Sequence, residues 1–220
     1  MFCVDSLAYH VRREGIDFRS RFSLRIILVH LAIIAVFGIW WPHIRGTEFF
    51  DPVFLAAYAC LGVLFAGPAA AQAFANRPQS VADAFARIAL AAVYGEAIAL
   101  IILIAGIATV LIARTSPIGP DWIGLAFAAV LGFTGAVAMA SVAAWFALRF
   151  SPGVARQALR VLFLGLLVLF FFESRWLPDV IGRGISICAG IAILAFFQIR
   201  GAVARIMRTE DRNNGRIRSS

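Results

Sequence analysis

Six long apolar runs limit what this chain can fold into more than any other feature of the sequence. They lie at about 24–41, 53–75, 88–113, 122–148, 157–172 and 180–199. A helix needs roughly 20 mainly apolar residues to cross the hydrocarbon core of a bilayer, so these runs predict a helical membrane protein. Because 62% of the residues are hydrophobic and only 15% are charged, little chain is left over for a soluble domain.

The predicted fold class is therefore all-α, a polytopic membrane protein with six transmembrane helices over residues 24–199. The fifth run is the weakest, because its uninterrupted apolar part, 161–172, would span only about 18 Å as a helix. It either crosses fully, with Arg156 and Arg160 extending it at the cytoplasmic end, or forms a re-entrant hairpin with the sixth run.

The two ends of the chain are polar segments. In residues 1–23, Leu7, Val11, Phe18 and Phe22 recur on one helical face among charged residues, which predicts an amphipathic helix in the cytoplasmic interface. Residues 200–220 are basic and polar, and we expect them to form a disordered cytoplasmic tail.

Arginine distribution predicts the orientation. All of the 20 basic residues are arginine, and the formal net charge is +8. If both termini are cytoplasmic, the inner loops and tails hold most of the arginines, and only Arg45, Arg114, Arg175 and Arg183 lie outside. This asymmetry follows the positive-inside rule and explains the basic balance without a nucleic-acid partner.

Small residues at four-residue spacing predict close helix packing, either within a tight bundle or at a subunit interface, because small side chains let backbones approach in a membrane. Three runs carry such stripes: Gly62, Ala66 and Ala70 in the second; Gly124, Ala128, Gly132, Ala136 and Ala140 in the fourth; Gly182, Ser186 and Gly190 in the sixth.

Glu96 is the one acid deep in an apolar run, about 12 Å beyond Ile88 along a helix. A carboxylate at that depth is costly unless it is paired, protonated or exposed to water. It is therefore either part of a substrate or ion path, with Tyr94, His30 and Gln72 as further candidate residues, or a packing residue that pairs with His30 or Gln72. The sequence leaves both alternatives open.

Other chemistry has little support in the sequence. No hydrolase, zincin or P-loop motif is present, so we expect no enzyme activity. His30, His43 and His10 share no apolar run, which argues against a haem or metal site. Cys3, Cys60 and Cys188 are too far apart for a typical zinc motif or disulfide framework.

The segment after the second run contains Ser80 three residues before Asp83, a helix-capping pattern. We expect a short cytoplasmic helix within 76–87, between the second and third crossings. Arg77, Asp83 and Arg87 supply its charge.

An amphipathic segment, six crossings in 220 residues and this short helix together resemble the membrane (permease) subunit of an ABC transporter of the export (type 2) class. The resemblance is architectural and covers nearly the whole chain. It implies a homodimer in the bacterial cytoplasmic (inner) membrane, with a soluble ATPase docked at 76–87, where Arg77, Asp83 and Arg87 would be the coupling residues. The chain departs from the family before the third crossing, where the usual charged, glycine-containing segment is reduced to Arg77-Pro78 and Asp83. ATP would bind only to that partner, and this chain would hold no cofactor. The alternative is a non-catalytic membrane scaffold or assembly protein.

Overall fold

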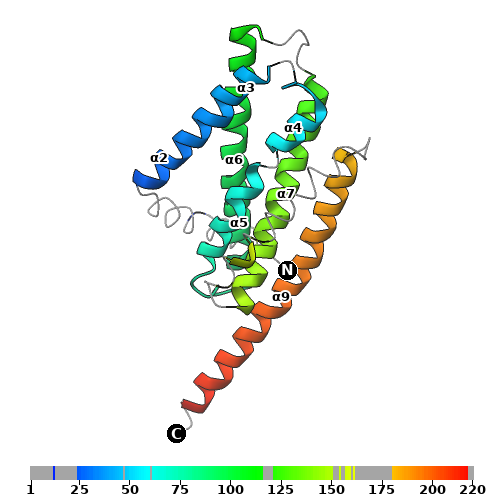
Figure 1. Cartoon of the computed structure of the whole chain (residues 1–220). Coiled ribbons are helices and arrows are strands. Elements are labelled where there is room, and N and C mark those ends of the chain that lie inside the picture. The colour runs from blue at the N-terminus through cyan, green and yellow to red at the C-terminus, as the bar shows by residue number, and fades with distance from the viewer. Residues whose placement is uncertain are drawn as a thin grey trace.

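The computed structural model describes residues 24–46, 48–59, 61–115, 121–150 and 180–217, and positions 12, 154, 157–159 and 161. Its regular structure in these residues is helical throughout (Figure 1). Four helices are long and apolar enough to cross a membrane: Leu24–Ile44, Val81–Ala113, Trp122–Arg149 and Arg183–Arg208. The all-helical class is thus confirmed, and these helices have the length and composition of an integral membrane protein.

The first crossing is one continuous helix with a widened middle. It comprises α2 (Leu24–Ile33), the π-helix η1 (Ile34–Trp40) and α3 (Trp41–Ile44), and its α2 end leans away from the other helices (Figure 1). A π-turn loosens the regular backbone ladder. Two carbonyls of η1 accept hydrogen bonds from other helices, Phe37 from the Tyr58 hydroxyl at 2.6 Å and Gly38 from the Thr109 hydroxyl at 3.1 Å. Those bonds tie η1 to its neighbours.

The second run is described as α4 (Pro52–Ala59) and α5 (Leu61–Ala73). Pro68 lies inside α5, and the helix nevertheless continues for five more residues, to Ala73. A tight turn then leads directly into α6 (Val81–Ala113), a single helix of 33 residues. The prediction of a separate short helix within 76–87 is therefore wrong. The Ser80 hydroxyl accepts a 3.0 Å hydrogen bond from the Asp83 N–H and so caps the long helix α6 itself.

Helices α7 (Trp122–Arg149) and α9 (Val180–Ile217) pack along each other. The Asp121 carboxylate begins α7 by accepting the backbone N–H groups of Ile123 and Gly124, both at 3.1 Å. Helix α9 continues to Ile217 and projects beyond the end of α7 (Figure 1). This corrects the expected disordered tail, because residues 200–217 extend the last helix without a break.

Small residues pack the helices as expected in two of the three stripes. Gly62, Ala66 and Ala70 are buried in α5, and Ala128, Gly132, Ala136 and Ala140 are buried in α7. In α9 the stripe is not part of the bundle contact at Gly190, which is exposed and where an added methyl group would meet no atom of another described element within 4 Å. The helix instead packs through Gly184, which faces Leu131, and further along through Ala195, Ile199 and Val203.

Two sequence predictions fall outside the described residues. The amphipathic helix expected in 1–23 is described only at Arg12, and the fifth run, 157–172, only at 157–159 and 161. The six-crossing count therefore stays a prediction.

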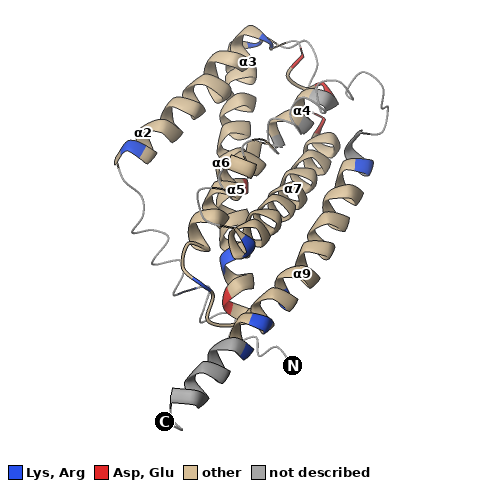
Figure 2. Cartoon of the chain, turned by 60° about the horizontal axis from the view of Figure 1, so that its bottom comes forward, with Lys and Arg blue, Asp and Glu red and all other residues tan. Residues whose placement is uncertain are grey.

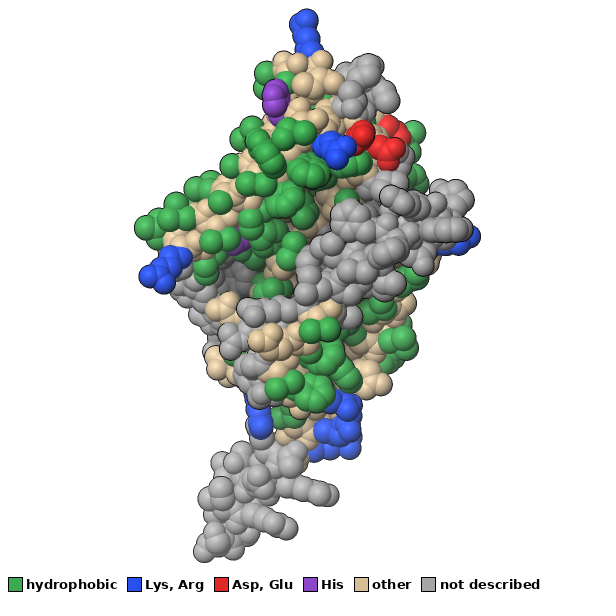
Figure 3. All heavy atoms as spheres, viewed as in Figure 1, with side chains coloured by type: hydrophobic (Ala, Val, Ile, Leu, Met, Phe, Trp, Pro, Cys, Tyr) green, Lys and Arg blue, Asp and Glu red, His purple; other side chains and the backbone are tan. Residues whose placement is uncertain are grey.

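Two apolar clusters form the core of the described bundle. One joins alanine-rich stretches of α5, α6 and α7 with Ala195, Ile199 and Val203 of α9. The other, nearer the loop 45–51, is built from larger side chains that include Phe49, Tyr58 and Ile102. Apolar side chains also cover much of the visible surface (Figure 3), and charged side chains gather toward the two ends of the bundle (Figure 2). Such a surface suits a hydrocarbon surrounding.

Candidate functional site in the bundle interior

Glu96 lies on α6 between the two apolar clusters. Its side chain is 7% exposed, and its Oε2 atom accepts no hydrogen bond from any residue that the structure describes. A methyl group built on Gly62 of α5 would lie 3.0 Å from this Oε2. The carboxyl group therefore lies close against Gly62, and a side chain at that position would have to displace it by a few tenths of an ångström.

The close contact between α5 and α6 positions this carboxyl group. A methyl group built on Gly95 would lie 2.4 Å from the carbonyl oxygen of Gly62, and 2.9 Å from both the Cβ and the backbone nitrogen of Ala66. Real Cβ atoms do not approach backbone atoms so closely, so the two helices touch through their backbones at this level. Glu96 follows Gly95 directly, so the same contact fixes the position of Glu96 along α5.

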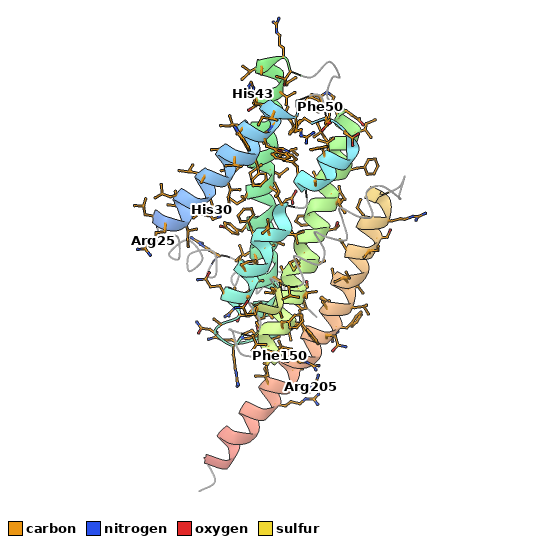
Figure 4. The ribbon with its side chains drawn as sticks, viewed as in Figure 1. Arg25, His30, His43, Phe50, Phe150 and Arg205 are labelled. Carbon is orange, nitrogen blue, oxygen red and sulfur yellow. The ribbon has the colours of Figure 1, made fainter. Side chains whose placement is uncertain are left out.

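His30, Tyr94 and Phe65 form an aromatic group between the first crossing and the α5–α6 pair. The Tyr94 hydroxyl is hydrogen-bonded to His30 Nε2, and the rings of His30 and Phe65 lie 5.2 Å apart. His30 Nδ1 lies at hydrogen-bond distance from the carbonyl oxygen of Ile26, which can only accept, so Nδ1 is the donor. In a neutral imidazole Nε2 then accepts, and the Tyr94 hydroxyl donates to it. His30 is labelled on α2 in Figure 4.

Glu96 and Tyr94 belong to different sides of α6. Two residues along a helix correspond to a turn of about 200°. Tyr94 consequently meets the first crossing, whereas Glu96 meets Gly62 inside the bundle. The pairing of Glu96 with His30 that the sequence left open is not what the structure has, since His30 is bonded to Tyr94.

Gln72, the fourth candidate, is not part of this group. It is exposed near the end of α5, ten residues or about 15 Å along the helix from Gly62. The structure therefore brings together His30 and Tyr94, places Glu96 nearby on the opposite side of α6, and leaves Gln72 apart.

Arg87 and Asp83 form a buried ion pair at the start of α6, 3.0 Å apart and with exposed fractions of 8% and 1%. The Arg87 guanidinium also donates to the carbonyl oxygens of Ala73 and Asn76, at 2.7 and 2.9 Å. Asp83 accepts the backbone N–H of Gln79 at 2.8 Å. This network joins the end of α5 to the start of α6, and only Arg77 of the three expected coupling residues is exposed.

Sequence reasoning missed the residues that surround the candidate site. Phe65 looked like any apolar residue of the second run, and Tyr58 and Thr109 hold η1 through partners that only the fold reveals. Gly62 carried a signal, because it belonged to a small-residue stripe, but that stripe did not indicate Glu96 as its neighbour. Among the described residues, no group of three or more histidine, cysteine, aspartate or glutamate side chains could hold a metal ion.

Comparison of the chain with protein-family models, with curated proteins and with solved structures finds no match.

Proposed function

We propose that this chain is the membrane subunit of a transporter, and that Glu96 lies on its path. One observation carries the proposal: a carboxyl oxygen inside the bundle that has no hydrogen-bond donor among the described residues. Buried polar atoms are satisfied in the great majority of cases, and each exception asks for an explanation. An ionisable residue at membrane depth is a functional-site hypothesis by default.

A packing role explains this geometry less well. A glutamate that serves to fix helix positions gains its stabilising effect from a donor on the neighbouring helix. Here the neighbour of Oε2 is Gly62, which offers space and no side-chain donor. A proton, or a polar group of a transported compound, would satisfy the oxygen, so the site fits a transient ligand.

The remaining parts of the proposal come from the resemblance to export-class permeases. The chain would work as a homodimer in the bacterial inner membrane, with both termini cytoplasmic, and a soluble ATPase would supply the energy. The turn between α5 and α6 is the proposed contact with that ATPase, through the exposed Arg77. Asp83 and Arg87 would hold the shape of the turn through their buried hydrogen bonds to its backbone.

The first test replaces Glu96 with Gln in the full chain. We expect transport-coupled ATP hydrolysis of the reconstituted complex to fall at least about tenfold. The melting temperature in detergent should change by less than about 2 °C, equivalent to under about 1 kcal/mol for a chain of this size. The amide keeps the shape of the side chain, so a large loss of stability together with activity would favour the scaffold interpretation.

A matched control is Glu48→Gln, which removes the same charge at an exposed position near the far end of the bundle. Activity should be retained in that variant. If both substitutions reduce activity equally, the effect comes from net charge and not from a position inside the bundle.

The second test determines whether an ATPase binds the chain. The chain is purified from its native membranes in mild detergent, and bound proteins are identified by mass spectrometry. A stoichiometric ATPase that is lost in Arg77→Ala and kept in Arg45→Ala would support the permease proposal. Recovery of the chain without an ATPase would refute the ABC assignment, whatever the outcome for Glu96.

A further inference from the structure

Exposed arginines of α7 and α9 lie around the end of the bundle where α7 stops. We call Arg149, Arg200 and Arg208 the basic cluster; all three are exposed. The two helices run in the same direction, with Gly184 against Leu131 and Cys188 near Gly135. In both contacts the α9 residue lies the same number of positions after the α7 residue in the sequence. The same spacing places Arg149, the last residue of α7, level with residue 202 of α9, so Arg149 and Arg200 lie at nearly the same depth. Figure 4 labels Phe150, which follows Arg149, and Arg205 of α9 at this end of the bundle.

No acidic group offsets this charge in the part of α7 and α9 whose side chains are described. Asp83 is the one acidic side chain described at this end, and it is buried against Arg87. Beyond Arg208 the sequence of α9 adds two acids and two arginines up to Ile217. The opposite end is balanced, since its described charges are three arginines and three acids: Arg45, Arg114, Arg183, Glu48, Asp51 and Asp121.

An apolar track leads from the basic cluster toward the middle of the bundle. Phe197 lies three residues before Arg200 and Leu194 lies three residues before Phe197. Their exposed fractions are 62% and 69%. Side chains three residues apart lie close together on a helix surface. On α7, at the same end, the Arg149 guanidinium lies 5.1 Å from the ring centre of Trp145, a residue type that favours the membrane interface.

We propose that the basic cluster binds the phosphate headgroup of an anionic phospholipid, whose acyl chains lie along Phe197 and Leu194. Positive charge at the interface attracts anionic headgroups, and arginine binds phosphate through a planar pair of donors. The apolar track selects a lipid over a soluble anion, because an acidic protein or free phosphate would leave Phe197 and Leu194 uncovered. This site is separate from Glu96 and does not rest on the transporter proposal.

Native mass spectrometry of the full chain in mild detergent tests the site, with phosphatidylglycerol and phosphatidylcholine titrated separately. The variant Arg149→Gln/Arg200→Gln/Arg208→Gln is compared with Arg45→Gln/Arg114→Gln/Arg183→Gln, which removes the same charge from the opposite end. We expect the cluster variant to bind phosphatidylglycerol roughly tenfold more weakly or worse, from the attraction of each interfacial arginine for anionic lipid. The control variant should stay within about twofold of the unmodified chain on the same basis, because its arginines are offset by nearby acids.

Three outcomes would overturn the proposal. If phosphatidylglycerol binding is weakened equally in both variants, the effect comes from net charge. If the unmodified chain binds both lipids equally, the site has no preference for an anionic headgroup. Displacement of phosphatidylglycerol by soluble glycerol phosphate would show that the headgroup alone is bound and that the apolar track has no part. Circular dichroism of each variant confirms that the helices are intact, so weaker binding reports on the site.

Discussion

Gly95→Ala should destabilise the protein, and the structure sets the size of the effect. The added methyl group would lie 2.4 Å from the Gly62 carbonyl oxygen, and its other close contacts include the backbone nitrogen of Ala66. Backbone atoms cannot rotate away, so α5 and α6 must separate by roughly 0.8 Å to restore van der Waals distances. Overpacking of this kind costs about 1–3 kcal/mol, and the higher helix propensity of alanine returns up to about 1 kcal/mol.

The net loss is about 1–2 kcal/mol, which corresponds to a decrease in melting temperature of roughly 2–8 °C for a chain of this length. The measurement is thermal unfolding of the purified protein in detergent, followed by circular dichroism. Separation of the helices would also move Glu96, so transport-coupled activity should fall together with stability in this variant.

Gly190→Ala is the matched control, because it makes the same substitution in another long apolar helix. No atom of another described element lies within 4 Å of the added methyl group at Gly190, so only the helix-propensity gain remains. Its melting temperature should be unchanged or higher by up to about 4 °C. An unchanged melting temperature for Gly95→Ala, or equal decreases in the two variants, would refute the backbone contact between α5 and α6.

Substitutions at Arg87, Tyr58 and Ser80 test three contacts elsewhere in the bundle, each by the shift in thermal unfolding. Arg87→Ala should cost about 3–5 kcal/mol because it leaves a buried carboxylate without its partner, whereas Arg77→Ala at the exposed turn should stay within about 0.5 kcal/mol. Tyr58→Phe removes the hydrogen bond to the Phe37 carbonyl and should cost about 0.6 kcal/mol, the average for such bonds in membranes; a cost of zero would show that η1 is held by packing alone. Ser80→Ala should cost about 1 kcal/mol through loss of the α6 cap, and Ser80→Asp should restore most of it.

Several elements of the fold could be predicted from sequence because their causes are local. The ends of α7 follow from Asp121 and from the helix-breaking sequence Ser151-Pro152-Gly153 shortly after Arg149, and the predicted run differs from the helix by one residue. The Ser80 cap was also predicted correctly, since it needs only the spacing to Asp83. The length of α6 was not, because residues 81–87 are too polar for an apolar run and become helical through capping and the buried Asp83–Arg87 pair.

The α9 stripe shows what the spacing of small residues does not predict. Four-residue spacing identifies a face of small residues, but it does not say which face a neighbouring helix will cover. In α7 the predicted face is the buried one, whereas in α9 the neighbour covers Gly184 and Ala195, and Gly190 stays uncovered. Helix rotation depends on both partners, so one helix alone does not contain the information.

The sequence by itself determined that this chain is helical, that its helices suit a membrane, and that Glu96 is an unusual residue at its depth. These follow from composition and period, which act within a single helix. Only the tertiary structure decided that Glu96 faces Gly62, that His30 meets Tyr94, and that the end of α7 lies level with Arg200 of α9. Each of those relations depends on how two helices rotate and align against each other, and that is set by the packing of all of them together.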